Sequence, residues 1–91
     1  MKDVDSLIEQ LESAHSFPGP FTFKIIGPNT PAFRTEVQNR IGPRTVESTQ
    51  ERLSKNDAHV AITIRITVPS AQDVLNIYQE LSNITNVKYV L

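Results

Sequence analysis

Three cationic side chains occupy positions in this chain from which they could converge on one anion. Lys24, Arg65 and Lys88 lie in three separate segments where apolar and polar residues alternate, and each stands at a polar position. Because successive side chains of a strand point to opposite faces, these positions belong to the face turned away from the core. Ammonium and guanidinium groups bind carboxylates and phosphates through charge-assisted hydrogen bonds. The sequence therefore predicts a ligand-binding site at Lys24, Arg65 and Lys88, for a small anionic ligand or an acidic protein partner.

The same cations also have a purely structural interpretation. Arg65 could pair across a hairpin with Glu47 or Glu51, which would leave the two lysines in solvent. Exposed ion pairs of this kind are common in proteins and contribute little free energy. The sequence leaves both interpretations open.

No other group of residues forms a catalytic or metal-binding pattern. His15 and His59 are far apart, and neither belongs to a cluster with the spacing of metal ligands. Ser70 and Asp73 are explained by their places at the start of a helix, where a serine caps free backbone N–H groups. The chain has no cysteine, so it offers neither a thiolate ligand nor a cysteine nucleophile. We expect no catalytic residues, no metal and no cofactor.

The charge balance argues against binding to nucleic acid. The chain has 91 residues, with 9 Lys plus Arg against 10 Asp plus Glu, whereas nucleic-acid-binding domains usually carry a basic excess. Single-stranded RNA is bound by stacking its bases on exposed aromatic rings. Phe21, Phe23 and Tyr89 alternate with the core positions instead of with Lys24 and Lys88. We therefore expect no nucleic-acid partner.

Compartment signals favour the cytoplasm. No stretch approaches the roughly 20 apolar residues that span a bilayer. The N-terminus is acidic, whereas a signal peptide begins with basic residues. Small secreted domains are usually rich in disulfides, and this chain has no cysteine. The sequence predicts a cytoplasmic protein with no membrane association.

The strongest structural signal is the segment 59–68, which reads His-Val-Ala-Ile-Thr-Ile-Arg-Ile-Thr-Val. Every second residue is β-branched and apolar, and the residues between are polar or small. A period of two over this length predicts a strand with one buried and one polar face. A polar second face indicates an antiparallel sheet that helices cover on one side only.

Periodicity and punctuation predict the remaining elements. Helices are expected within residues 4–14, from the cap Thr30 to Gly42, and from the cap Ser70 to Ser82, with strands over 21–26 and 86–91. Residues 45–53 are polar on both faces, so their pattern permits a helix or a loop. We assign a strand because the turn-forming residues 54–57 lead from this segment into the strand 59–68. Its charged residues suit a sheet edge, where they discourage pairing with other chains.

The order of these elements predicts an α+β fold. After an N-terminal helix it is strand, helix, strand, strand, helix, strand, the ferredoxin-like β-α-β-β-α-β sandwich. Right-handed crossovers give a four-stranded antiparallel sheet in order 4-1-3-2, with two helices on one face. We divide the chain into an N-terminal helical extension, residues 1–16, and a ferredoxin-like domain, residues 17–91.

Several motifs also resemble one known family. The run from Phe17 to Gly27, reading FPGPFTFKIIG, resembles the opening of the YbeD-like family of small uncharacterised bacterial proteins. The likeness resumes at Ser54-Lys55 and continues through His59 and Tyr78-Gln79-Glu80-Leu81 to the final VKYVL. The resemblance implies an ACT-like form of the ferredoxin-like fold, similar in shape to amino-acid-sensing regulatory domains, which characteristically pair. It brings no established activity, so it assigns no functional residue. The chain departs from the family pattern in its longer N-terminal helix and in a first domain helix cut short at Gly42-Pro43.

These observations together predict a non-enzymatic regulatory or protein-interaction module that self-associates as a homodimer. It would sense a small acidic metabolite if the three cations form a site. The apolar stripe Val4, Leu7, Ile8 and Leu11 must be buried, either over its own domain or on a second subunit or partner. The alternative function is a small enzyme with a site formed between subunits. Such an enzyme would need an acid–base pair converging in a pocket, and the sequence shows none.

Overall fold

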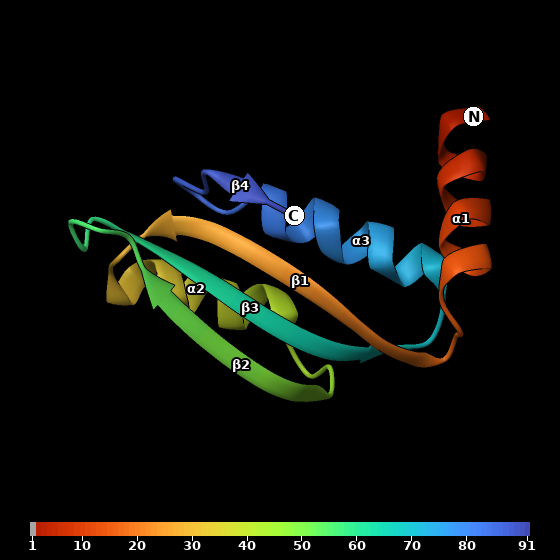
Figure 1. Ribbon diagram of the computed structural model, residues 1–91, viewed down its shortest axis with the longest axis horizontal. Coiled ribbons are helices and arrows are strands. Elements are labelled where there is room, and N and C mark those ends of the chain that lie inside the picture. Colours follow the sequence, from red (N-terminus) through yellow and green to blue (C-terminus); the bar gives the residue numbers. More distant parts are fainter. Residues whose placement is uncertain (1) are drawn as a thin grey trace.

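Four strands form one antiparallel sheet, and the helices that cover it lie on one side (Figure 1). The computed structural model describes residues 2–91. Within this range the elements in chain order are α1 (Lys2–Ala14), β1 (Gly19–Pro28), α2 (Pro31–Ile41), β2 (Val46–Leu53), β3 (His59–Val68), α3 (Ala71–Ser82) and β4 (Tyr89–Val90). The sheet order is β2-β3-β1-β4, which is the predicted order counted from the other edge. The predicted ferredoxin-like fold is confirmed.

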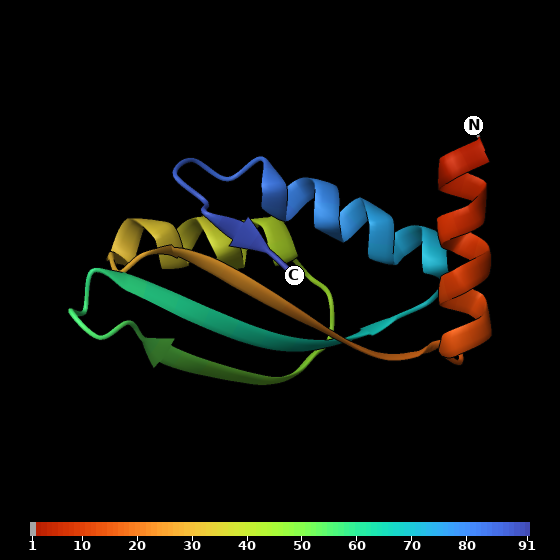
Figure 2. The same cartoon turned by 45° about the horizontal axis from the view of Figure 1, so that its top comes forward.

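The molecule has a helix layer and a sheet layer. Figure 2 shows α2 and α3 on the same side of the sheet, and no helix of residues 2–91 on the other side. The uncovered side, here called the open face, carries the polar positions of the strands. The alternation in β3 explains this arrangement, because its apolar side chains are buried while those between them stay partly or fully exposed.

Apolar side chains from both layers fill the core. The buried set includes Phe23 and Ile25 of β1, both with no exposed surface, and the apolar positions of α2, β3 and α3. No polar or charged residue of the described chain is buried. Fully burying an aliphatic or aromatic side chain stabilises a fold by about 1.5–3 kcal/mol. The core therefore rests on hydrophobic contact alone, without a buried polar network.

The two helices of the covering layer, α2 and α3, begin and end where the sequence predicts, whereas α1 begins at Lys2, before the predicted residue 4. The Thr30 hydroxyl accepts the N–H of Phe33 at 3.1 Å, and the Ser70 hydroxyl accepts the N–H of Asp73 at 3.4 Å. Gly42 ends α2 with φ at 62°, a conformation that glycine adopts without steric cost, and its N–H bonds to the carbonyl of Gln38. These caps use backbone groups that would otherwise lack partners.

The polar segment after α2 is an edge strand, as assigned. β2 pairs with β3 along its length, and all eight of its residues are exposed. The pairing slips once, between Val46 and Ser48, which leaves Glu47 as an extra residue. The side chains of Ser48, Gln50 and Arg52 therefore join the open face, opposite the outward residues of β3.

The prediction for the last strand is wrong in its phase. Tyr89 was expected in the core, but it pairs with Ile26 on the open face and is 55% exposed. Val87 and Val90, three positions apart, both pack against the core instead. Strict alternation fails because the chain turns tightly before β4. In this turn the backbone N–H of Val87 donates a hydrogen bond to the carbonyl of Ile84, and Asn86 has a positive φ. Two successive residues, Lys88 and Tyr89, are consequently exposed.

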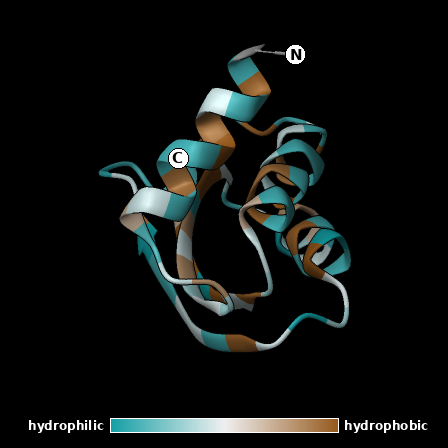
Figure 3. Cartoon of the chain, turned by 90° about the vertical axis from the view of Figure 1, so that its right-hand side faces the viewer, coloured by the Kyte–Doolittle hydropathy of each residue, from teal (hydrophilic) through white to brown (hydrophobic). Residues whose placement is uncertain are grey.

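The N-terminal helix stands at one end of the sheet and projects past α3 (Figures 1 and 3). Its C-terminal half is anchored: Leu11 packs against the core, and the ring of His15 lies 4.8 Å from that of Phe21. Phe21 in turn contacts Tyr78 of α3, where burial raises the pKa of the phenol. Farther from the anchor, Val4 and Leu7 are 37% and 46% exposed. The apolar stripe is thus only half covered by its own domain.

Candidate functional site

The pairing of the strands sets outward side chains of the open face in rows that cross the sheet. In one row Arg52 of β2 pairs with Ala61 of β3, Ala61 with Ile26 of β1, and Ile26 with Tyr89 of β4. Ala61 and Ile26 are partly buried, and Tyr89 is exposed. This row, here called the apolar row, puts a strip of hydrophobic surface across the open face with an arginine at one end.

Lys24 occupies the neighbouring row. It pairs with Thr63, which pairs with Gln50 of β2. A hollow of about 350 Å³ lies over this part of the face, lined by Lys24, Gln50, Glu51, Arg52, Ala61 and Thr63. The three ion pairs found within residues 2–91 involve neither Lys24 nor Arg52. Two cations and two neutral hydrogen-bonding side chains therefore line one shallow hollow, a set suited to carboxylate or phosphate oxygens.

Arg65, the second predicted site residue, is engaged elsewhere. Its Nε lies 3.4 Å from Oε1 of Glu47, and the hydroxyl of Thr67 donates to the other carboxylate oxygen. This is one of the two structural pairings that the sequence left open. Both charged side chains remain half exposed, so the pair is weak and can exchange with solvent.

Lys88, the third predicted residue, lies at the β4 edge of the sheet. Its backbone N–H donates to the carbonyl of Ile26 at 2.7 Å, and its Nζ lies 5.8 Å above the ring of Tyr89. Lys24 instead exchanges backbone hydrogen bonds with Leu91. The two lysines sit on neighbouring chain segments but are offset along β1. The structure therefore brings Lys24 together with Arg52, while Lys88 and Arg65 are held by other partners at the margins.

Arg52 lines the hollow beside Lys24, and the sequence reasoning did not include it among the candidate residues. The predicted strand 45–53 is polar on both faces, so its pattern alone gave no phase. The extra residue at Glu47 also shifts the alternation between the start of β2 and its end. Arg52 could have been identified as the residue opposite Ala61 of β3, but only if the pairing register of the β2–β3 hairpin were known.

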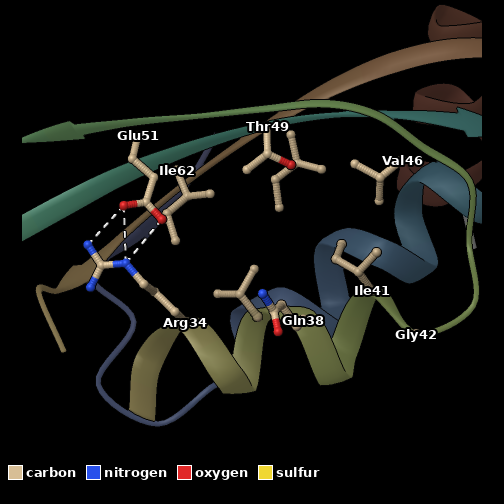
Figure 4. Close-up of a pocket in the computed structure, with 10 residues that line it drawn as sticks. Arg34, Gln38, Ile41, Gly42, Val46, Thr49, Glu51 and Ile62 are labelled. Carbon is tan, nitrogen blue, oxygen red and sulfur yellow. Dashed lines mark hydrogen bonds and ion pairs between the residues drawn. The ribbon is translucent and has the colours of Figure 1, made fainter. Parts of the chain in front are cut away.

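A second hollow lies on the helix side of the sheet, between α2 and β2 (Figure 4). Its volume is about 220 Å³, and its apolar walls come from Val37, Ile41, Val46, Ile62 and Ile64. An ion pair between Arg34 and Glu51 closes one end. Two nitrogens of Arg34 donate hydrogen bonds to the carboxylate, Nη2 to Oε1 at 2.9 Å and Nε to Oε2 at 3.0 Å. Arg34 also donates to Oδ1 of Asn29 and to the carbonyl of Thr30. The ion pair fastens the helix layer to the edge strand.

Electrostatics make this second hollow a poor place for proton transfer. The hydrogen bonds from Arg34 lower the pKa of Glu51, and the same contact raises the pKa of Arg34. The only acid in the lining is therefore held ionised and already paired. Residues 2–91 also contain no cluster of three or more His, Cys, Asp or Glu side chains that could hold a metal ion. None of the helices described there is both long and apolar enough to cross a bilayer.

Comparison with known sequences identifies relatives over almost the whole chain. Residues 12–91 match a family model described as protein of unknown function (DUF493). The UPF0250 protein of Citrobacter koseri is 33% identical over 85 residues, covering 90% of this chain and 97% of the relative. The UPF0250 protein YbeD of Salmonella arizonae shows the same identity and coverage.

Comparison with solved structures gives the same fold. The ACT domain of a GTP pyrophosphokinase from Chlorobium tepidum has a TM-score of 0.68 at 14% identity, covering 79% of this chain and 94% of that domain. The C-terminal domain of the MgtC protein from Mycobacterium tuberculosis has a TM-score of 0.64, also at 14% identity, over 85% and 87% of the two chains. At such identities the likeness concerns the fold alone.

Proposed function

This chain belongs to the DUF493 family of proteins of unknown function, and from that premise we propose that it is a small regulatory or interaction module without catalytic activity. Its function is to bind acidic groups on the open face of its sheet. The ACT-like fold supports a regulatory role by analogy only, since one fold can serve many functions.

The observation that carries this proposal is the hollow that holds Lys24 and Arg52. Neither cation has a carboxylate partner within the described chain, whereas Arg34, Arg40 and Arg65 each have one. Gln50 and Thr63 add neutral donors to the same lining. An acidic ligand there would gain two charge-assisted contacts without breaking an existing ion pair.

Arg65 and Lys88 extend the site at its margins. Arg65 joins when an incoming anion displaces the weakly held Glu47, and Lys88 meets the far end of an extended acidic partner beside Tyr89. The hollow is large enough for a small acidic metabolite, and the wider face suits an acidic protein surface. A small acidic metabolite and an acidic protein surface would both present carboxylates or phosphates to the site. The experiment below is designed to distinguish the two.

Self-association and a cytoplasmic location complete the proposal. Val4 and Leu7 of α1 and Val46 and Leu53 of β2 are exposed large apolar side chains, and burial of such surface supports association of two copies. The absence of cysteine supports a reducing compartment. The ionised, paired state of Glu51 supports a role other than acid–base catalysis.

The test is thermal unfolding in the presence of defined anions: inorganic phosphate, a tricarboxylic acid and a poly-glutamate peptide. We expect at least one of them to raise the melting temperature of the wild-type protein, and Lys24→Gln with Arg52→Gln to abolish the rise. Lys55→Gln is the matched control, since Lys55 lies exposed in the turn between β2 and β3. A rise with small anions indicates a metabolite site, and a rise with the peptide alone indicates a protein partner. An equal rise in the double variant would refute the proposal.

A further inference from the structure

The helix α1 and the open face have complementary surfaces, and we propose that α1 of one copy docks on the open face of a second copy. This inference rests on the proposed function and names the acidic partner of the same site. It assigns a binding role to the exposed half of a helix whose other half packs against the core through Leu11.

The exposed half of α1 is both apolar and acidic. Val4 and Leu7 are exposed, and Asp3 and Asp5 of the same half lie on the two flanks of the apolar stripe. Both carboxylates are exposed, and neither takes part in the ion pairs of the described chain. Figures 1 and 3 show this part of α1 extending beyond the rest of the molecule.

Charge decides which surface can cover this helix. Pairing of α1 with α1 of a second copy would bring two acidic flanks together, and like charges at a contact oppose association. The open face has the opposite sign at its unpaired positions, Lys24 and Arg52, with Lys88 at the far edge. Between these cations the apolar row offers Ala61, Ile26 and Tyr89. An apolar stripe with acidic flanks therefore meets an apolar strip with basic neighbours.

The exposed half of α1 is long enough to reach across part of the sheet. At 1.5 Å per residue, the half of α1 that precedes its anchor at Leu11 is about 10 Å long. Neighbouring strands lie roughly 4.8 Å apart, so the outer strands of the four-stranded sheet are about 14 Å apart. Because the apolar row runs across the strands, the exposed half of α1 lying along it would cover about three neighbouring strands.

The helix cannot reach its own open face without losing its anchor. It contacts α3 on the covered side of the sheet, Leu11 packs against the core, and the ring of His15, just after the helix, lies 4.8 Å from that of Phe21 in β1. The occupant of the open face is therefore a helix from another copy. The contact joins two different surfaces. It therefore closes as a dimer when each copy docks its α1 on the open face of the other copy.

Exchange of charges between the two surfaces tests the inference. One variant carries Lys24→Glu and Arg52→Glu, and a second carries Asp3→Lys and Asp5→Lys. We expect sedimentation to show a wild-type dimer at micromolar concentration and each variant alone as a monomer. Mixing the two variants should restore association, because the basic helix of one then faces the acidic sheet of the other. Ser13→Lys, on the opposite side of α1 from the apolar stripe, is the matched control and should leave the dimer intact.

Three results would overturn the inference: a wild-type monomer, variants that still dimerise, or a mixture that stays monomeric while circular dichroism shows both variants folded. The anion experiment separates this failure from failure of the proposed function. If anions stabilise the protein through Lys24 and Arg52 but charge exchange leaves the mass unchanged, the open face binds acidic groups and α1 is not the partner. If neither effect is found, both proposals fail.

Discussion

Gly27 of β1 lies against the ring of Phe33 of α2 so closely that a β-carbon at Gly27 would stand 2.3 Å from Cζ of that ring. Phe33 is itself 3% exposed and therefore has little room to move away. The contact fixes the distance between the helix layer and the sheet at this point.

Gly27→Ala should therefore destabilise the protein by about 1–3 kcal/mol, the usual cost of inserting a methyl group into a packed core. Chemical denaturation measures the loss. Phe33→Leu removes the ring that the methyl group meets, so the second substitution should cost less in the Gly27→Ala background than in the wild type. Additive effects of the two substitutions would contradict the steric explanation.

Ile64→Ala should lower the free energy of unfolding by about 2–5 kcal/mol, because it leaves a cavity beneath the helices. Ile64 is 4% exposed on the covered face of β3. Its neighbour Thr63 lies on the open face, so Thr63→Ala is the matched control and should cost much less. Equal losses in urea denaturation would contradict the assignment of the two faces.

Glu51→Gln should reduce stability at neutral pH and have no effect in acid. The pKa of Glu51 is lowered in the folded protein by its hydrogen bonds to Arg34. A carboxylate with a lowered native pKa stabilises the fold fully above its unfolded pKa, and that contribution is lost as pH falls through the native pKa. The difference in melting temperature between wild type and Glu51→Gln should thus shrink steadily below the ordinary glutamate pKa of about 4.3.

The control for this experiment is Glu12→Gln, which removes an exposed carboxylate that takes no part in an ion pair of the described chain. It should change the pH profile far less. A difference for Glu51→Gln that persisted undiminished at low pH would show that the ion pair is not its cause.

Glu47→Gln should strengthen the response to anions. The substitution leaves Arg65 without its carboxylate partner and adds a third free cation to the open face. We expect the anion-induced rise in melting temperature to exceed that of the wild type, and Arg65→Gln to have a smaller effect than Lys24→Gln. A response unchanged by Glu47→Gln would mean that Arg65 does not reach the bound anion.

Strongly patterned segments made most of the fold predictable. The alternation in β3 and the caps at Thr30 and Ser70 each rest on local chemistry, and the structure confirms them. The phase of β4 failed because a tight turn precedes it, and Val87 and Val90 then both reach the core. A strand of two paired residues is too short for alternation to correct such a shift.

The position of a candidate side chain was predictable where it depends on the alternation of its own strand, and not where it depends on the pairing between strands. Lys24 follows from the alternation of its own strand. The engagement of Arg65 depends on which acid of β2 lies beside it, and the extra residue at Glu47 decides that. Glu51, the other candidate, faces the helices and binds Arg34 instead. Such choices belong to the register between strands, which no single segment specifies.

The order in which the strands are connected along the chain also affects how fast the sheet can form. β2 and β3 are joined by a short turn, but the central pair β1 and β3 is separated by all of α2 and β2. Closing the longer loop between β1 and β3 costs more conformational entropy, and this cost arises before the contacts between the two strands can offset it. We therefore expect the hairpin to form first and the pairing of β1 with β3 to limit the folding rate. Core substitutions in β1 should slow refolding, whereas changes in the exposed half of α1 should leave the refolding rate unaltered.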